Sequence, residues 1–257
     1  NGMTKKDKVL VVGNWKANPD TLKLAKDNLS AIKKVATRNK NIEIVICPPV
    51  IFLFSLKGNS RPVSLGAQDI FTEPNGAFTG FVGYEALRET KIKYVIVGHS
   101  ERRETGESDF DINRKIKTAL SLGITPILCV GEKHRDANLE YLSFLKSQLQ
   151  MAFKDIPKSA VQKIVVAYEP IWAIGKNAKR DAKPSEIEET VILIRRVIGD
   201  IYNTKSVPPL RIIYGGSVSQ NNAVDIYTSA HVDGFLVGRA SLTPKIFGEI
   251  IEKLNKL

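Results

Sequence analysis

The stretch IVVAYEP, residues 164–170, joins an unbroken apolar run to a carboxylate, Glu169, followed at once by a proline. A short apolar run without polar alternation is typical of a parallel strand that is buried on both faces. A charged side chain is rarely left inside a protein without a partner or a role. The position of Glu169 therefore predicts a buried strand that ends where its carboxylate can be used.

The same pattern recurs through the chain. Seven further Val- and Ile-rich runs are VLVVGN (9–14), IEIVICPP (42–49), VSLGAQ (63–68), YVIVGH (94–99), TPILCVG (125–131), RIIYGG (211–216) and GFLVGR (234–239). Helical patterns lie between runs at 21–36, 110–123, 138–153 and 184–202. Eight strands alternating with helices, without a linker or a low-complexity segment, predict an α/β fold. The expected form is one (β/α)8 barrel of eight parallel strands that spans residues 1–257 as a single domain.

Local signals bound two of these helices. Gly123 is expected to follow the end of the helix in 110–123 as its C′ residue. In the helix of 184–202, Pro184 precedes Ser185 and Glu188 follows three residues later, which is a capping-box pattern. A doubly wound open sheet is the alternative fold. It has less support because no G-x-G-x-x-G follows the first run.

Composition narrows the functional class. The chain has 257 residues, 43% of them hydrophobic and 25% charged, and its formal net charge is +11. The basic residues are spread over one helical pattern and one loop without interleaved aromatic residues, which favours solvated surfaces and attraction for anionic substrates over nucleic-acid binding. We therefore expect no nucleic-acid partner.

Other features bear on location. No apolar stretch is long enough for a membrane span, and the segment before Val9 lacks the apolar core of a secretory signal. Cys47 and Cys129 lie in separate apolar runs, which favours a reducing, cytoplasmic setting without disulfides. We expect the Asn-Gly before Met3 to be a cloning remnant, and no contact with a membrane.

In a (β/α)8 barrel, functional side chains lie at the carboxyl ends of the strands. The residues at these ends are polar or glycine, and they are Asn14, Lys16, His99, Ser100, Glu101, Cys129, Glu132, Glu169, Gly215, Gly216, Ser217, Gly238 and Arg239. They are expected to converge on one rim of the barrel, which becomes the candidate site.

Three of these side chains suggest proton transfer. Glu169, shielded by Ile171 and Trp172, can act as a base whose proton affinity rises as water is excluded. His99 can donate a hydrogen bond to a substrate oxygen. Lys16, beside Asn14, can stabilise negative charge that forms on that oxygen. The alternatives are a structural ion pair for Glu169 with a lysine of the rim, and a purely structural role for His99.

Glycines at two neighbouring strand ends suggest an anion site. Backbone N–H groups of residues 215–218 and of Gly238 can form a phosphate cradle. Residues 170–179 begin with a proline, have an apolar middle and contain Gly175, which suits a lid that swings as a block. The alternative is a static loop packed by Trp172. Three scattered histidines, of which His134 and His231 are expected at the surface, give little support for a metal site.

Together these motifs resemble the triosephosphate isomerase family from Val9 onward. The stretches that carry the resemblance are GNWK (13–16), AQD (67–69), NGAFTG (75–80), VGHSERR (97–103), CVGE (129–132), YEPIWAIG (168–175), YGGSV (214–218) and GFLVG (234–238). The resemblance implies a TIM barrel that interconverts dihydroxyacetone phosphate and D-glyceraldehyde 3-phosphate in glycolysis and gluconeogenesis. No cofactor and no metal would be needed.

The resemblance also implies roles for individual residues. Glu169 would be the catalytic base and His99 the neutral electrophile that polarises the carbonyl. Lys16 and Asn14 would stabilise the enediolate, and Glu101 would position Lys16. Gly175, Ser217 and Gly238 would bind the phosphate, chiefly through backbone N–H groups.

The sequence departs from the family pattern in three places. The lid after Gly175 lacks a second glycine and is about two residues longer. The last strand ends Gly238-Arg239 instead of Gly-Gly; we expect the backbone at Arg239 to avoid positive φ and its N–H to bind phosphate. Phe81 replaces a glutamate that bridges subunits, and we still expect a homodimer in which Phe81 makes apolar contacts. Thr79 keeps its place in the loop that enters the partner's site in the family.

Two other functions are weighed against this one. Another phosphate-binding barrel enzyme, of the indole-glycerol-phosphate or ribulose-phosphate type, would need a different set of strand-end residues. A non-enzymatic protein that holds an anionic polymer on its basic surface would give a salt-dependent gel shift without isomerase activity. An isomerase assay distinguishes these functions.

Overall fold

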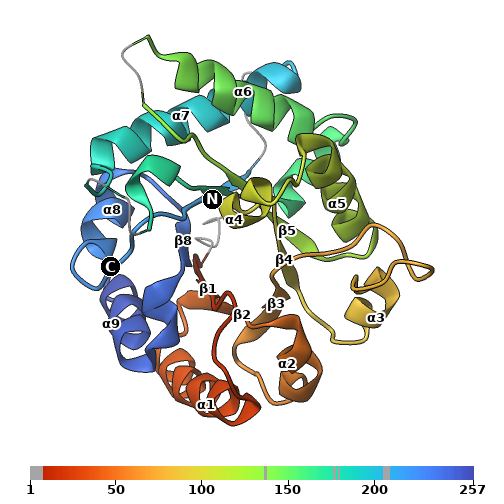
Figure 1. Cartoon of the computed structure of the whole chain (residues 1–257). Helices are drawn as coiled ribbons and strands as arrows, with labels where there is room; N and C mark the ends of the chain where they lie inside the picture. The colour runs from red at the N-terminus through yellow and green to blue at the C-terminus, as the bar shows by residue number, and fades with distance from the viewer. Residues whose placement is uncertain (1–7, 136–137, 176–177, 179, 205–208) are drawn as a thin grey trace, which may run out of the picture.

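Eight parallel strands form a closed barrel in which every strand pairs with its neighbours in chain order (Figure 1). The computed structural model describes residues 8–135, 138–175, 178, 180–204 and 209–257. The strands are β1 (Val9–Asn14), β2 (Ile42–Cys47), β3 (Ser64–Ala67), β4 (Tyr94–Val97), β5 (Thr125–Val130), β6 (Val165–Tyr168), β7 (Arg211–Tyr214) and β8 (Gly234–Val237). β1 also pairs with β8, which closes the barrel. The predicted (β/α)8 fold is confirmed, and the open sheet is excluded.

Helices surround the barrel in the order expected for this fold (Figure 1). The α-helices are α1 (Leu22–Arg38), α2 (Val50–Leu56), α3 (Tyr84–Arg88), α4 (Ser100–Glu104), α5 (Asp109–Ser121), α6 (Glu140–Ala152), α7 (Pro184–Ile201), α8 (Ala223–Ser229) and α9 (Pro244–Leu254). Short 3-10 helices are η1 (Lys158–Lys163), η2 (Ile171–Ala173) and η3 (Arg239–Leu242). Within the ranges described, none of the helices combines the length and the apolar character needed to cross a membrane.

The two predicted helix boundaries had different outcomes. Gly123 follows the end of α5 with φ 70°, as a C′ glycine does. The capping box predicted from Ser185 and Glu188 was wrong. α7 begins at Pro184, and the Glu186 carboxylate accepts the backbone N–H of Lys183 at 2.8 Å. Proline suits the first helical position because the N–H that it lacks would have no partner there. The helix therefore begins at Pro184, and the capping box lies two residues closer to the amino end than predicted.

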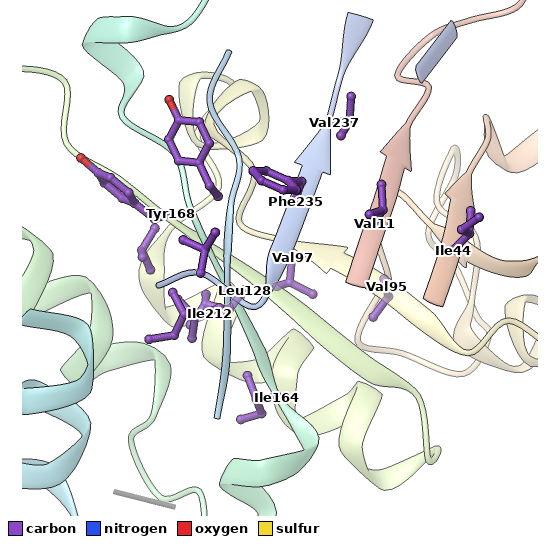
Figure 2. Close-up of a cluster of buried hydrophobic side chains, with 14 of the residues drawn as sticks. Val11, Ile44, Val95, Val97, Leu128, Ile164, Tyr168, Ile212, Phe235 and Val237 are labelled. Atoms are coloured by element: carbon purple, nitrogen blue, oxygen red, sulfur yellow. The ribbon is translucent and has the colours of Figure 1, made fainter. Parts of the chain in front are cut away.

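The core has two layers because both faces of each strand are buried. Leu10 and Val12 of β1 belong to a cluster whose members all lie in strands, which is the interior of the barrel. Val11, between them, belongs to the larger cluster between the barrel and the helices. Figure 2 shows part of that outer layer, with Val11, Leu128 and Phe235 coming from three strands. Alternate burial on opposite faces explains why the runs are continuously apolar.

Candidate active site

The carboxyl ends of the strands open into a cavity of about 660 Å³. Most of the predicted strand-end residues line it, together with Gly175 of the predicted lid. These strand-end residues are Asn14, Lys16, His99, Ser100, Glu169, Gly215, Gly216, Ser217, Gly238 and Arg239. Glu101 lines a neighbouring cavity of about 370 Å³, which shares Asn14, Lys16 and His99 with the first. Residues at the carboxyl ends of five strands, β1, β4, β6, β7 and β8, therefore meet at one mouth.

Glu169 lies at the floor of this mouth. It directly follows β6, its backbone N–H donates to the carbonyl of Val130 at 2.8 Å, and the residue is 3% exposed. Its carboxylate has two partners from the β4 end: Oε1 lies 3.1 Å from Nε2 of His99, and Oε2 accepts the backbone N–H of Ser100 at 3.1 Å. Its partners thus belong to the site, in contrast to the alternative of an ion pair with a rim lysine.

Two glycines leave room for Glu169. A Cβ at Gly131 would lie 1.7 Å from the backbone oxygen of Glu169, so any side chain there would displace the strand end. A Cβ at Gly215 would lie 3.0 Å from Cγ of Glu169. The glycines after β5 and β7 therefore allow the backbones and the carboxylate to approach closely.

His99 is held in one tautomer. Its Nδ1 accepts the backbone N–H of Glu101 at 3.2 Å, and the ring caps the first turn of α4. A nitrogen that accepts an N–H carries no proton, so the proton of the neutral ring lies on Nε2, which faces Glu169. The residue is 8% exposed. The ring can therefore donate from Nε2 to an oxygen in the cavity.

Lys16 is fixed through its backbone. Its φ is 53°, a conformation that non-glycine residues adopt only when their surroundings impose it. The Asn14 side chain accepts the Lys16 N–H at 3.0 Å, and the amide of Gln68 donates to the Lys16 carbonyl at 2.7 Å. Trp15 between them is fully buried and donates to the carbonyl of Ser241. The strained lysine is thus held from both sides.

The Lys16 ammonium reaches the site with a carboxylate partner. Nζ forms a short ion pair with Oε1 of Glu101, and the other Glu101 oxygen lies 3.7 Å from Nδ1 of His99. Gln68 lies in the stretch AQD (67–69), but no role is predicted for it from the sequence. Its hydrogen bond to Lys16 depends on a contact between segments 52 positions apart, which no local pattern reveals.

Unpaired N–H groups gather beside these side chains. The backbone N–H groups of Gly216, Gly238 and Arg239 donate to no acceptor in the described part of the chain. The backbone φ of Arg239 is not positive, as expected. Unpaired N–H groups at adjacent strand ends can bind an anion. The Ser217 hydroxyl, in contrast, donates to the carbonyl of Ala173 at 3.1 Å and so ties the β7 end to η2.

A second carboxylate anchors the segment that follows Glu169. Oε1 of Glu132, which is 1% exposed, accepts from the Tyr168 hydroxyl and from Nε1 of Trp172, both at 2.8 Å, and contacts Arg135. Glu132 lines neither cavity at the mouth. Lys176, Asn177 and Lys179 of the predicted lid lie outside the described residues, so the anchor concerns only the start of the lid.

Cys129 lies inside the barrel below the site and is fully buried. Burial and the neighbouring Glu169 carboxylate raise the pKa of its thiol well above the usual range. A thiol that keeps its proton is not a nucleophile. In the residues that the structure covers, no group of His, Cys, Asp or Glu side chains has the arrangement of a metal site.

The closed parallel barrel brings a carboxylate, an imidazole, an ammonium and unpaired backbone N–H groups to one mouth. These are the groups that a barrel enzyme needs for proton transfer on a phosphorylated compound. The family model described as triosephosphate isomerase matches residues 9–254. The chain belongs to the triosephosphate isomerase family.

Curated relatives agree over almost the whole length. The triosephosphate isomerase of Endomicrobium trichonymphae is 39% identical over 252 residues, which are 95% of this chain and 98% of the relative. That of Aquifex aeolicus is 40% identical over 249 residues, 94% of this chain and 98% of the relative. That of Emericella nidulans is 39% identical over 243 residues, 92% of this chain and 95% of the relative.

Proposed function

We propose that this chain performs its family's reaction with Glu169 as the base. The protein is an isomerase that interconverts dihydroxyacetone phosphate and D-glyceraldehyde 3-phosphate. The observation that carries the catalytic assignment is the 3.1 Å approach of the Glu169 carboxylate to Nε2 of His99, beside unpaired N–H groups at the ends of β7 and β8.

The reaction moves one proton between adjacent carbons. Glu169 takes the proton from carbon 1 of dihydroxyacetone phosphate as the carbonyl at carbon 2 becomes an enediolate oxygen. Nε2–H of His99 and the Lys16 ammonium stabilise the charge on that oxygen, and the Asn14 side chain lies beside them. Glu169 then returns the proton to carbon 2, while the hydroxyl proton of carbon 1 moves to the oxygen of carbon 2. The product is glyceraldehyde 3-phosphate.

The preset geometry lowers the barrier because its donors need little reorganisation as charge develops. Removal of one such donor typically costs about 3–4 kcal/mol of transition-state stabilisation. Glu101 has a positioning role, since it holds the Lys16 ammonium and lies near His99. Glu169 itself must exchange its bond to the Ser100 N–H for the substrate carbon, so binding and base placement are coupled.

Phosphate binding protects the intermediate. An enediolate that bears a neighbouring phosphate can expel it, and a dry site that holds the phosphate suppresses this side reaction. We assign the phosphate to the N–H groups of Gly216, Gly238 and Arg239, with further contacts from Ser217 and Gly175. The cavity lined by these residues supports the assignment, because it also holds Glu169 and His99.

The test is a coupled assay of isomerase activity on the wild type and on Glu169→Asp. Loss of one methylene withdraws the carboxylate from the carbon, and kcat should fall by roughly a hundredfold or more. Glu252→Asp, at an exposed position of α9, is the matched control and should retain full activity. An active Glu169→Asp variant would show that Glu169 is not the base.

We also propose that two copies of the chain form a homodimer. The neighbouring cavity of about 370 Å³ has an apolar lining from Phe71, Phe81 and Val82 and also contains Lys16 in its wall. The centroids of the stacked Phe71 and Phe81 rings lie 4.4 Å apart. Phe81 is 60% exposed and Val82 41% exposed, which is apolar surface that a partner would cover. Thr79 belongs to the same loop and would enter the partner's site.

Two further proposals concern the chain as a whole. We propose that it works in the cytoplasm, in glycolysis and gluconeogenesis; both cysteines are free and buried, which suits a reducing compartment. We also propose that residues 1–257 form one domain. The pairing of the first strand with the last supports this, because it leaves the barrel without a division into separate sheets.

A further inference from the structure

We propose that the guanidinium of Arg239 contacts the substrate's phosphate, in addition to the backbone N–H groups at the ends of β7 and β8. This inference rests on the proposed function, because it takes the mouth of the barrel as the triose phosphate site. It assigns Arg239 a side-chain role in affinity that a glycine with the same backbone N–H could not fulfil.

The position of Arg239 places it at the anion side of the mouth. It follows Gly238 directly after β8 and lines the same cavity as Lys16, Gly216 and Ser217. A Cβ at Gly238 would lie 3.7 Å from Cε of Lys16, so the end of β8 runs beside the lysine side chain. The residue is exposed, and its guanidinium can therefore meet a ligand as the ligand enters.

The charges of the described cavity lining leave the Arg239 cation available. Among the residues that the structure describes, the lining holds the carboxylates of Glu169 and Asp181 and the permanent cations of Lys16 and Arg239. Lys16 is already paired with Glu101. The Arg239 guanidinium makes no hydrogen bond or ion pair with any residue the structure describes. A phosphate can bind its guanidinium without breaking an existing pair.

Backbone and side chain of Arg239 can serve one anion together. Its φ is not positive, so an L-residue sits there without strain, and its N–H is unpaired among described residues. The guanidinium adds a planar set of donors that suits phosphate oxygens. Attraction also depends on charge, and a phosphate monoester gains its second negative charge near pH 6. The contribution of Arg239 should therefore be larger at pH 7.5 than at pH 5.5.

The experiment compares Arg239→Gln and Arg239→Lys with the wild type. Arg38→Gln is the matched control, because Arg38 is an exposed arginine at the end of α1, where its substitution changes the net charge equally. The readouts are KM and kcat for glyceraldehyde 3-phosphate, the competitive inhibition constant of inorganic phosphate, and the melting temperature, at low and high salt and at both pH values.

For Arg239→Gln we expect KM and the phosphate inhibition constant to rise together by about fivefold to tenfold, with kcat changed by less than about twofold. Arg239→Lys should lie between, and Arg38→Gln should match the wild type. The difference in KM between Arg239→Gln and the wild type should shrink in 0.5 M salt, because salt screens contacts between exposed charges. Should Arg239→Gln fold poorly, Arg239→Gly removes the guanidinium, keeps the N–H and should show the same rise.

Unchanged KM and phosphate inhibition in a folded Arg239→Gln or Arg239→Gly variant would overturn the inference and leave the isomerase assignment intact. An equal effect of Arg38→Gln would also overturn it, since net charge alone would then explain the result. A wild type without isomerase activity would instead overturn the proposed function itself.

Discussion

At Lys16 the chain accepts a strained backbone, and the surrounding residues explain how it persists. The left-handed backbone conformation of Lys16, with its positive φ, costs an L-residue about 1–2 kcal/mol. The bonds from Asn14 and Gln68 and the burial of Trp15 offset that cost and aim the ammonium at Glu101 and the mouth. Strain at this residue is therefore linked to the placement of positive charge where the enediolate is proposed to form.

The two thiols should be inert in the folded protein. Cys47 and Cys129 are both fully buried, and burial raises the pKa of each thiol above its ordinary value. We expect a chromogenic thiol reagent at pH 8 to leave both unmodified in the native protein and to modify two thiols per chain after unfolding in guanidinium chloride. Rapid modification of Cys129 in the native protein, with loss of activity, would contradict the burial argument.

Residue types and their order made it possible to predict which side chains meet at the mouth of the barrel. Glu169, His99 and Lys16 each follow an apolar run, and a parallel barrel brings such ends to one rim. The partners of these residues were not predictable in the same way. Ser100 acts through its backbone N–H, and Gln68 acts across two loops, so neither contribution leaves a mark in the local pattern.

At the scale of elements, the start of α7 carries a charged clamp after the lid. The Arg180 guanidinium donates two hydrogen bonds to the Glu186 carboxylate, at 2.7 and 2.8 Å. Cζ of Arg180 lies 4.7 Å from the centroid of the Trp172 ring. Glu186 also accepts the backbone N–H of Lys183. The clamp therefore links η2, which begins the predicted lid, to α7, the helix that follows it.

The clamp predicts a pH-dependent loss of stability. The hydrogen bonds from Arg180, above all, lower the pKa of Glu186 to about 2 from 4.5. Because the folded-state pKa is depressed, this stability is present above about pH 4.5 and is lost as the pH falls toward 2. At pH 6 the free energy of unfolding of Glu186→Gln should be about 1–2 kcal/mol below that of the wild type, a value that allows for the partial exposure of the Glu186 carboxylate. This deficit should narrow steadily below pH 4.5.

The measurement is urea unfolding of Glu186→Gln and wild type between pH 6 and 3. Glu252→Gln is the control, since its exposed carboxylate on α9 should show no such trend. A Glu186→Gln deficit that stays constant over this range would contradict the account of the clamp.

The boundaries of helices and strands were predicted less well than their existence. β1 was predicted at its observed bounds, whereas the run 94–99 overshoots β4 because Gly98 and His99 already belong to the rim. The short helices α2, α3 and α4 were not predicted. They have five to seven residues, too few for a clear apolar period, and tertiary contacts decide their conformation.

At the scale of the whole molecule, the apolar loop that contains Phe81 predicts association. A sedimentation experiment at micromolar concentration should give about twice the 28.5 kDa mass of one chain. Phe81→Asp should weaken the dimer by tenfold or more, because it places a charge in an apolar contact. Phe110→Asp, at an exposed phenylalanine of α5, is the control. A wild-type mass near that of one chain would contradict the proposed dimer.

The barrel connects these scales, since eight buried strands bring residues from distant segments to one mouth. The most direct test is a crystal structure of the protein with a bound phosphate-bearing analogue of the enediolate. We predict its phosphate on the N–H groups of Gly216, Gly238 and Arg239, its oxygen on Nε2 of His99 and on Lys16, and the Glu169 carboxylate within about 3 Å of the reacting carbons. An analogue bound elsewhere, or a Glu169 carboxylate turned away from those carbons, would contradict the account.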